Sequence, residues 1–436
     1  MSLISNLNRR SATGPDVRYS SLGSIVAAAT GKKETLAEGL LMTHLRQKKK
    51  LALTISLAFA AFAAFGFSLP PAPGEQSQRG KVWRPTRIPA GVNFVGSQAC
   101  AECHKDKVAA QEKSSMGLAL ELVAESPILS SHKALAFRDG KFSYEILRKG
   151  DQSVYTVTDG KETISEPILY SFGQGKAGQT YLLKYAGDYY ESRVSYYAEI
   201  KSLDITLGYQ DTRPQSALEA FGRKLPRDEV MQCFNCHSTG AVSGAQLHLE
   251  KLAPGVRCEA CHGPGAEHVA AGKQGLQNKD KIFNPARLGG DELTQDFCGS
   301  CHRSAEEIVM APKRIGMNGV RFQPYRIFGS KCYSDDRRIS CTACHNPHES
   351  ASQDEAYYDT KCLACHKPGR GSGAVAKSSQ SGQSGQSGEG DAAPGCKVAA
   401  KNCASCHMPK VDLPGSHFKF TDHRIRIAKP GEPFPY

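Results

Sequence analysis

The most chemically informative feature of the sequence is the pattern Cys-x-x-Cys-His, which occurs seven times. Two thiols at this spacing can add across the two vinyl groups of one porphyrin, and the histidine that follows can reach the iron from the same side. The pattern therefore predicts seven covalently bound haem c groups. The predicted attachment residues are Cys100, Cys103, Cys233, Cys236, Cys258, Cys261, Cys298, Cys301, Cys341, Cys344, Cys362, Cys365, Cys403 and Cys406. The predicted proximal iron ligands are His104, His237, His262, His302, His345, His366 and His407.

Other uses of paired cysteines fit this pattern poorly. A redox dithiol or half of a zinc site needs no histidine directly after the second cysteine. Here every one of the seven pairs ends in histidine. We therefore favour haem attachment over zinc binding or thiol redox chemistry.

The remaining histidines are candidates for the opposite, distal side of the irons. His44 precedes the basic segment and is set aside. His348 follows its own motif too closely to fold over the same ring, so we expect it to reach a neighbouring iron, and the same argument applies to His268 after "HGPG". The candidate distal ligands are His268, His348, His417, His423, His248 and His132. A surface or hydrogen-bonding role is the alternative for each of them.

Six spare histidines do not suffice for seven irons. Met116 in "EKSSMGLAL" could supply a thioether, which would raise the potential of that haem. A core methionine on a helix is the alternative explanation of Met116. The seventh iron could instead keep an open position for a substrate.

The spacing of the motifs also predicts the fold class. After a first gap of 133 residues, successive motif histidines are 21 to 43 residues apart, which is too short for ordinary domains. We therefore expect a multihaem cytochrome c domain at 93–428, mostly short helices and loops wrapped around haems. Residues 142–207 alternate in the manner of strands and hold no Cys or His, so they predict a small antiparallel β insert. We expect this insert to cover the first haem or to form a docking face.

Three segments lie outside this predicted core. Residues 1–50 form an N-terminal segment expected to be disordered or cytoplasmic, with Met42 as an alternative start. Residues 51–69 are uncharged after a run of lysines, which is typical of a signal peptide or a membrane anchor and predicts export to the periplasm. Residues 369–395 are rich in Gly, Ser and Gln and predict a disordered loop.

Cys332 and Cys396, the two cysteines outside the motifs, are candidates for a disulfide, with free thiols as the alternative.

The net charge of +12 does not indicate a nucleic-acid partner. Residues 1–68 hold nine Lys and Arg against three acidic residues, which is half of the excess. The remainder lacks a basic patch interleaved with aromatic residues. The surplus cations are better explained by the propionates of seven haems.

Several stretches resemble multihaem cytochromes c of the nitrifier tetrahaem cytochrome type, distant relatives of pentahaem nitrite reductase. They are "FVGSQACAECHKDKVAAQEKSSMGLA", "GVRCEACHGPGAEHV", "RFQPYRIFGSKC", "CTACHNPH" and "CASCHMPK" with "HFKFTDHRI". The resemblance covers 93–427 and implies distal ligation by His268 and His348. It implies electron transfer between partner proteins. The lysine that replaces a motif histidine in nitrite reductase is absent here.

The sequence thus favours a periplasmic electron carrier that serves redox partner proteins or quinol-linked donors. A reductase of nitrite, hydroxylamine or an oxidised sulfur compound at one open haem is the alternative. Such a site needs a cationic pocket, for which Arg321 and Arg326 are candidates. A haem-based sensor or a subunit of a conducting filament is a third class.

Overall fold

The computed structural model describes residues 82–277, 279–311, 316–333, 339–366, 399–429 and 431–435. All of them belong to one compact unit, Gln78–Tyr436. The expected N-terminal segments 1–50 and 51–69, the expected loop 369–395 and Cys396 lie outside the described residues. Within the described residues, no helix is both long and apolar enough to cross a membrane.

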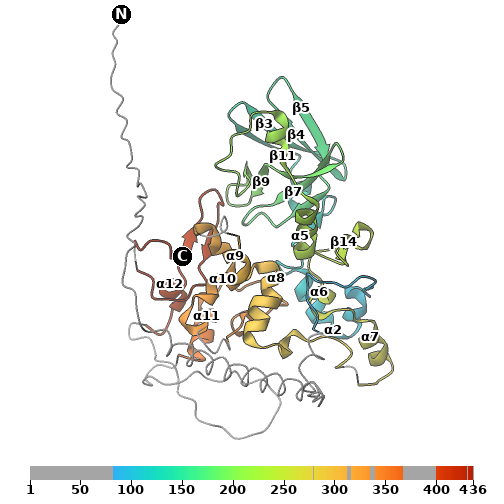
Figure 1. The fold of residues 1–436 in the computed structure, drawn as a ribbon, viewed down its shortest axis with the longest axis vertical. Helices are drawn as coiled ribbons and strands as arrows, with labels where there is room; N and C mark the ends of the chain where they lie inside the picture. The colour runs from blue at the N-terminus through green and yellow to red at the C-terminus, as the bar shows by residue number, and fades with distance from the viewer. Residues whose placement is uncertain are drawn as a thin grey trace, which may run out of the picture. The chain divides into compact units, whose positions relative to one another are not determined.

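The strands form two main antiparallel sheets, and Figure 1 shows β3, β4, β5, β7 and β11 gathered in one part of the unit. The four-stranded sheet has the order β2-β3-β4-β5 and consists of β2 (Ala134–Asp139), β3 (Phe142–Lys149), β4 (Gln152–Thr158) and β5 (Thr163–Pro167). The five-stranded sheet has the order β1-β6-β7-β8-β11 and consists of β1 (Leu120–Leu122), β6 (Tyr170–Phe172), β7 (Thr180–Tyr185), β8 (Asp188–Ser192) and β11 (Gly222–Lys224).

Four two-stranded ribbons complete the described strands. They are β9 (Val194–Tyr197) with β10 (Ser202–Ile205), β12 (Ser238–Thr239) with β15 (Ala253–Pro254), β13 (Val242–Ser243) with β14 (Gln246–Leu247), and β16 (Lys410–Asp412) with β17 (Lys419–Thr421). The strands therefore extend well beyond the small insert expected at 142–207. That expectation missed β2, whose six residues lie just before 142, and it missed strands of two or three residues, which carry no recognisable alternation.

The helices are short, as the motif spacing predicts. Those of the first half are α2 (Ser97–Glu112), α3 (Pro127–Ser131), α4 (Ala217–Phe221), α5 (Arg227–His237), η2 (Leu249–Lys251), α6 (Cys258–His262) and α7 (Ala266–Lys273). Those of the second half are η3 (Pro285–Arg287), η4 (Glu292–Cys298), α8 (Gly299–His302), α9 (Ala305–Val309), η6 (Met317–Arg321), α10 (Gln323–Phe328), η7 (Lys331–Tyr333), η8 (Cys341–Ala343), α11 (Glu355–Leu363) and α12 (Cys403–His407).

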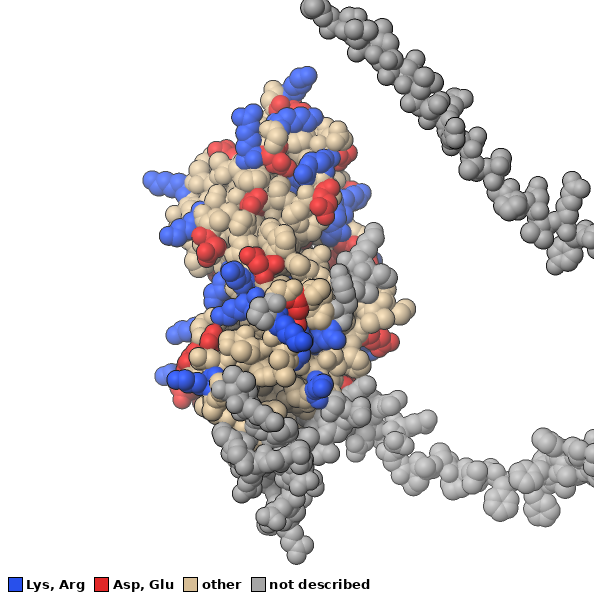
Figure 2. Space-filling view, turned by 90° about the vertical axis from the view of Figure 1, so that its left-hand side faces the viewer, with Lys and Arg blue, Asp and Glu red and all other residues tan. Residues whose placement is uncertain are grey.

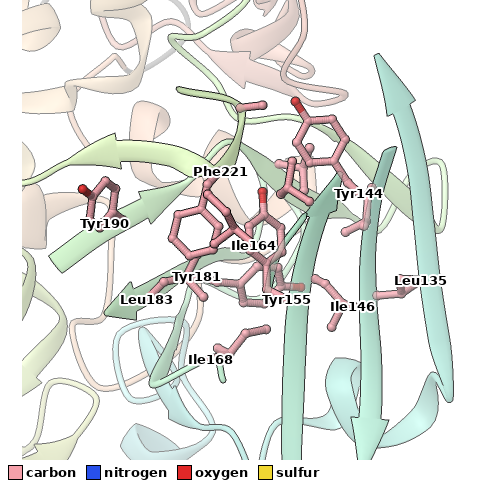
Figure 3. Packing of buried hydrophobic residues seen from close by; sticks show 14 of the residues in the cluster. Leu135, Tyr144, Ile146, Tyr155, Ile164, Ile168, Tyr181, Leu183, Tyr190 and Phe221 are labelled. Atoms are coloured by element: carbon pink, nitrogen blue, oxygen red, sulfur yellow. The ribbon is translucent and has the colours of Figure 1, made fainter. Parts of the chain in front are cut away.

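A conventional hydrophobic core fills the space beside the four-stranded sheet (Figure 3). Tyr155 and Phe221 are fully buried there, with ring centres 5.4 Å apart. Strand β7 has Tyr181 and Leu183 in this core, whereas Leu182 belongs to a second core on the other face. This alternation is what a strand packed on both faces requires.

The second core positions a motif. It packs Leu120 and Leu182 of the five-stranded sheet against Val230 and Phe234 of α5, which carries the second Cys-x-x-Cys-His. The β-rich part therefore supports a motif helix directly. On the face shown in Figure 2, Lys and Arg lie among Asp and Glu.

Candidate haem-binding sites

Each motif lies on or beside a helical turn. The seven turns belong to α2, α5, α6, η4 with α8, η8, α11 and α12. Residues three apart on a helix lie on the same face, so the two cysteines of each helical motif can reach the edge of one ring. In α2 the backbone leaves helical geometry at His104, the histidine of the first motif, with φ −117° and ψ 39°.

The motif thiols are sheltered from water in most cases. Burial raises the pKa of Cys233 to about 12 and the pKa of Cys261 and of Cys344 to about 11. These thiols are therefore neutral at physiological pH.

Three motif histidines are oriented by backbone carbonyls. The Nδ1 atoms of His237, His262 and His407 donate to the carbonyl oxygens of Ala119, Phe283 and Arg426, at 3.0, 3.0 and 2.9 Å respectively. A hydrogen bond at Nδ1 fixes the tautomer that leaves the lone pair of Nε2 available for a metal. These carbonyls leave no signal in the sequence, because every residue has one.

Burial also favours the neutral form of four motif imidazoles. Desolvation lowers the pKa of His237, His262, His302 and His345 below the usual value. It lowers the pKa of His423 to about 4. Neutral imidazole is the form that binds metals.

Three of the spare histidines face a motif histidine. Ring centres are 6.3 Å apart for His104 and His268, 6.1 Å for His262 and His348, and 6.2 Å for His345 and His423. Because a ligating nitrogen lies about 2 Å from its metal, two imidazoles on opposite sides of one iron have ring centres about 6 Å apart. The donors and their spacing therefore fit haem c.

The other three spare histidines have different neighbours. His132 donates from Nδ1 to the carbonyl oxygen of Ile128 at 2.8 Å and lies beside Tyr196. His248 pairs with Glu250 at 3.2 Å. His417 places Nε2 2.7 Å from the Asp204 carboxylate and packs against Tyr197. Their predicted distal ligation has no support from these positions.

The remaining sequence candidates are placed as follows. Met116 is half-buried in the turn after α2, and its carbonyl accepts from Val256 N at 2.9 Å. Arg326 is buried and forms a two-bond pair with Asp422, with Nε 2.8 Å and Nη2 3.0 Å from the carboxylate oxygens. The Arg326 guanidinium is therefore held in a buried ion pair and does not provide the positive charge of a substrate pocket. Burial raises the pKa of Cys332, whereas its suggested partner Cys396 lies outside the described residues.

Thiols of different motifs touch one another. Cys100 lies against Cys258, Cys236 against Cys301, Cys298 against Cys341, and Cys362 against Cys403. The first motif is thus next to the third, the fourth contacts the second and the fifth, and the sixth is next to the seventh. The order of the motifs in the sequence does not reveal which motifs are neighbours, since the first motif contacts the third and not the second.

A cavity of about 710 Å³ adjoins two of the motifs. Its walls include His237 and His302, and they carry three arginines: Arg223, Arg303 and Arg321. Arg223 is paired with Glu191 and Glu229. The same walls carry three carboxylates, Glu191, Asp228 and Glu229, so the cavity combines motif histidines with side chains of both charges.

Comparison with known proteins points to one class. The family described as "Cytochrome c554 and c-prime" matches residues 206–263, which include the second and third motifs. The multiheme cytochrome MtrA of Shewanella baltica (strain OS185) is 24% identical over 160 residues, which cover 31% of this chain and 45% of that protein. The chain therefore spans less than half the length of that relative. The crystal structure of the outer cell wall cytochrome OcwA is similar over 48% of this chain and 37% of that one, with 21% identity and a TM-score of 0.29. Together with the seven motifs, the sequence matches identify the chain as a multihaem c-type cytochrome related to cytochrome c554 and to MtrA.

Proposed function

We propose that each of the seven motifs holds one haem c and that the protein carries single electrons along the resulting series. The observation that carries this proposal is the contact between thiols of neighbouring motifs. Porphyrins attached at touching cysteines have their edges close together, which is the condition for rapid electron exchange. The pairs formed by Cys100 with Cys258 and by Cys298 with Cys341 are two examples.

The protein's own residues would tune this series. We propose bis-histidine ligation by His104 with His268, His262 with His348, and His345 with His423, which agrees with their ring spacing. The cysteines supply covalent attachment, and the carbonyls at Nδ1 hold the imidazoles in position. Haem supplies the one-electron chemistry, and the buried surroundings set its potential.

Export belongs to the same proposal. Haem c carriers work outside the cytoplasm, which agrees with the apolar stretch 51–69. We propose a periplasmic location, with a redox partner protein or a quinol-linked donor supplying electrons. In this proposal the N-terminal segment acts either as a cleaved signal peptide or as a membrane anchor.

Stopped-flow mixing tests electron transfer directly. The fully reduced protein is mixed with an excess of a small ferric cytochrome c, and the haem absorbance of both proteins is followed. The proposal predicts that the protein delivers as many electrons as it has haems. Delivery of one or two electrons, with the other haems left reduced, would contradict it.

Reduction of a small anion or of hydroxylamine is the second candidate function. The observation that favours it is the cavity beside His237, whose walls carry Arg223, Arg303 and Arg321 together with three carboxylates. Nitrite or an oxidised sulfur compound at an iron with an open position would need one of these arginines as its partner. Electron paramagnetic resonance of the oxidised protein separates the candidates. A high-spin ferric signal that changes on adding nitrite or hydroxylamine favours the reductase, and low-spin signals that do not respond favour the carrier.

A further inference from the structure

A buried carboxylate joins the first and third motifs. Glu259 occupies one of the two variable positions of the third motif, "CEACH", and its side chain is buried. Its carboxylate accepts backbone N–H groups from Val95 at 3.0 Å, Gly96 at 2.8 Å and Gly265 at 2.9 Å. A buried carboxylate that accepts several backbone N–H groups holds its donors in fixed positions.

Two of these donors lie at the start of the helix that carries the first motif. Gly96 directly precedes α2 and has φ 81°, a left-handed conformation that favours glycine. Gly96 is the N-cap residue of α2, and because glycine has no side chain it cannot cap the helix itself. The carboxylate of Glu259 therefore ties the start of the first-motif helix to the third motif.

Further contacts strengthen this junction. The other variable residue of the third motif, Ala260, accepts a hydrogen bond through its carbonyl from Trp83 Nε1 at 2.7 Å. Gln111 of α2 donates to the carbonyl of Val256, just before the third motif. Ala260 therefore holds Trp83 on the third motif, and Gln111 joins α2 to the segment just before that motif.

The charge of Glu259 reaches both attachment sites. It contributes to raising the pKa of Cys100, and in Cys258 it opposes the groups that lower the thiol pKa. These two thiols touch, so the carboxylate lies beside the facing edges of the two rings attached there. Negative charge in a poorly solvated place stabilises ferric over ferrous haem.

The same arrangement occurs at the sixth and seventh motifs. Asp359 on α11 is buried and accepts the backbone N–H groups of Asn402 at 2.7 Å and Cys403 at 2.8 Å. Cys403 begins α12 and the seventh motif, and its thiol lies against Cys362 of the sixth. An acidic side chain from one motif helix again fixes the start of the next.

We propose that Glu259 and Asp359 are positioning residues that hold two haem pairs in fixed register and lower their reduction potentials. The pairs are those attached at the first and third motifs and at the sixth and seventh. The inference rests on the proposed haem occupancy of these motifs.

The test compares two glutamates, each at a variable position of a motif. Glu259→Gln removes the buried charge at nearly constant volume, whereas Glu102→Gln removes an exposed charge, paired with Lys273 at 2.9 Å, from a variable position of the first motif. Potentiometric titration should show two haems shifted to higher potential in Glu259→Gln and none in Glu102→Gln. Soret circular dichroism, which reports the mutual orientation of coupled haems, should change in Glu259→Gln alone. Glu259→Asp keeps the charge but shortens the side chain. Its haem potentials should therefore be close to wild type, whereas its Soret dichroism should remain altered.

A second variant, Asp359→Asn, keeps the test decisive if Glu259→Gln folds poorly. Asp359→Asn should raise the potentials of a different haem pair, and Asp354→Asn, at the exposed N-cap of α11, is its matched control. Potentials and dichroism equal to wild type in both Glu259→Gln and Asp359→Asn would overturn the inference. A wild-type protein with its full haem content would leave the proposed function intact in that case, whereas missing haems in the wild type would refute the proposed function itself.

Discussion

At the scale of single residues, the surroundings of each histidine decide its role. His417 and His423 are six residues apart in "HFKFTDHRI", and their residue type does not distinguish them. The structure turns His423 towards His345, while His417 is held by Asp204, more than two hundred residues earlier in the chain. The sequence could indicate that His268 and His348 reach neighbouring motifs, because they follow their own motifs closely. It could not separate His417 from His423, since the difference depends on a distant carboxylate.

Replacing a facing histidine should change the spin state of one haem. In His268→Ala, one haem per chain should become high-spin ferric, because the iron beside His104 loses its second imidazole. Electron paramagnetic resonance of the oxidised protein measures this change. His248→Ala is the control, since His248 pairs with Glu250 at the surface. A spectrum of His268→Ala identical to wild type would show that His268 is not a ligand.

The buried pair of Arg326 and Asp422 should matter for stability. Arg326→Met should cost about 3–5 kcal/mol of unfolding free energy, because it leaves the Asp422 carboxylate buried without its main partner. Denaturant titration followed by circular dichroism measures the loss. Lys224→Met removes one partner of an exposed pair with Asp188 and should cost far less, because water already solvates both charges. Equal losses in the two variants would contradict this assignment.

At the scale of elements, strand length sets what the sequence can reveal. Strands β3 and β4 have eight and seven residues, and their alternation is readable in the sequence. Strands β1, β6 and β11 have three residues each, so no period can be recognised in them. These short strands complete the sheet that supports α5. This is why the β-rich part was expected to be a small insert.

Helix α4 offers a matched pair of substitutions for the β-rich core. Phe221→Ala should cost about 3–5 kcal/mol, because its ring is fully buried against Tyr155. Leu218→Ala, on the same helix, should cost under about 1 kcal/mol, because Leu218 is 37% exposed. Thermal unfolding followed in the far ultraviolet would separate the two. A similar loss of stability in both variants would show that Phe221 is not part of the hydrophobic core.

At the scale of the whole molecule, the chain is stabilised in two different ways. Residues 120–242 contribute two clusters of buried apolar side chains. Beyond the third motif, buried apolar residues such as Leu293, Ile308 and Val320 belong to neither cluster. That porphyrins form the interior around the later motifs stays a prediction. It rests on motif spacing, from which long-range strand pairing could not be predicted.

Removing haem should therefore unfold one part and spare the other. Chain produced without haem attachment should keep a protease-resistant fragment that contains the two main sheets, while the later motifs are digested. Limited proteolysis with mass spectrometry of the fragments checks this. Equal protection of the later motifs in the haem-free chain would show that they have an apolar core of their own.

Quantitation of covalent haem tests the central claim most directly. The pyridine haemochrome absorbance of the purified, denatured protein, divided by the polypeptide concentration from amino-acid analysis, gives haem per chain. Occupancy of every Cys-x-x-Cys-His predicts seven haems per polypeptide. A value clearly below seven in fully matured protein, or zinc in place of iron, would contradict the account.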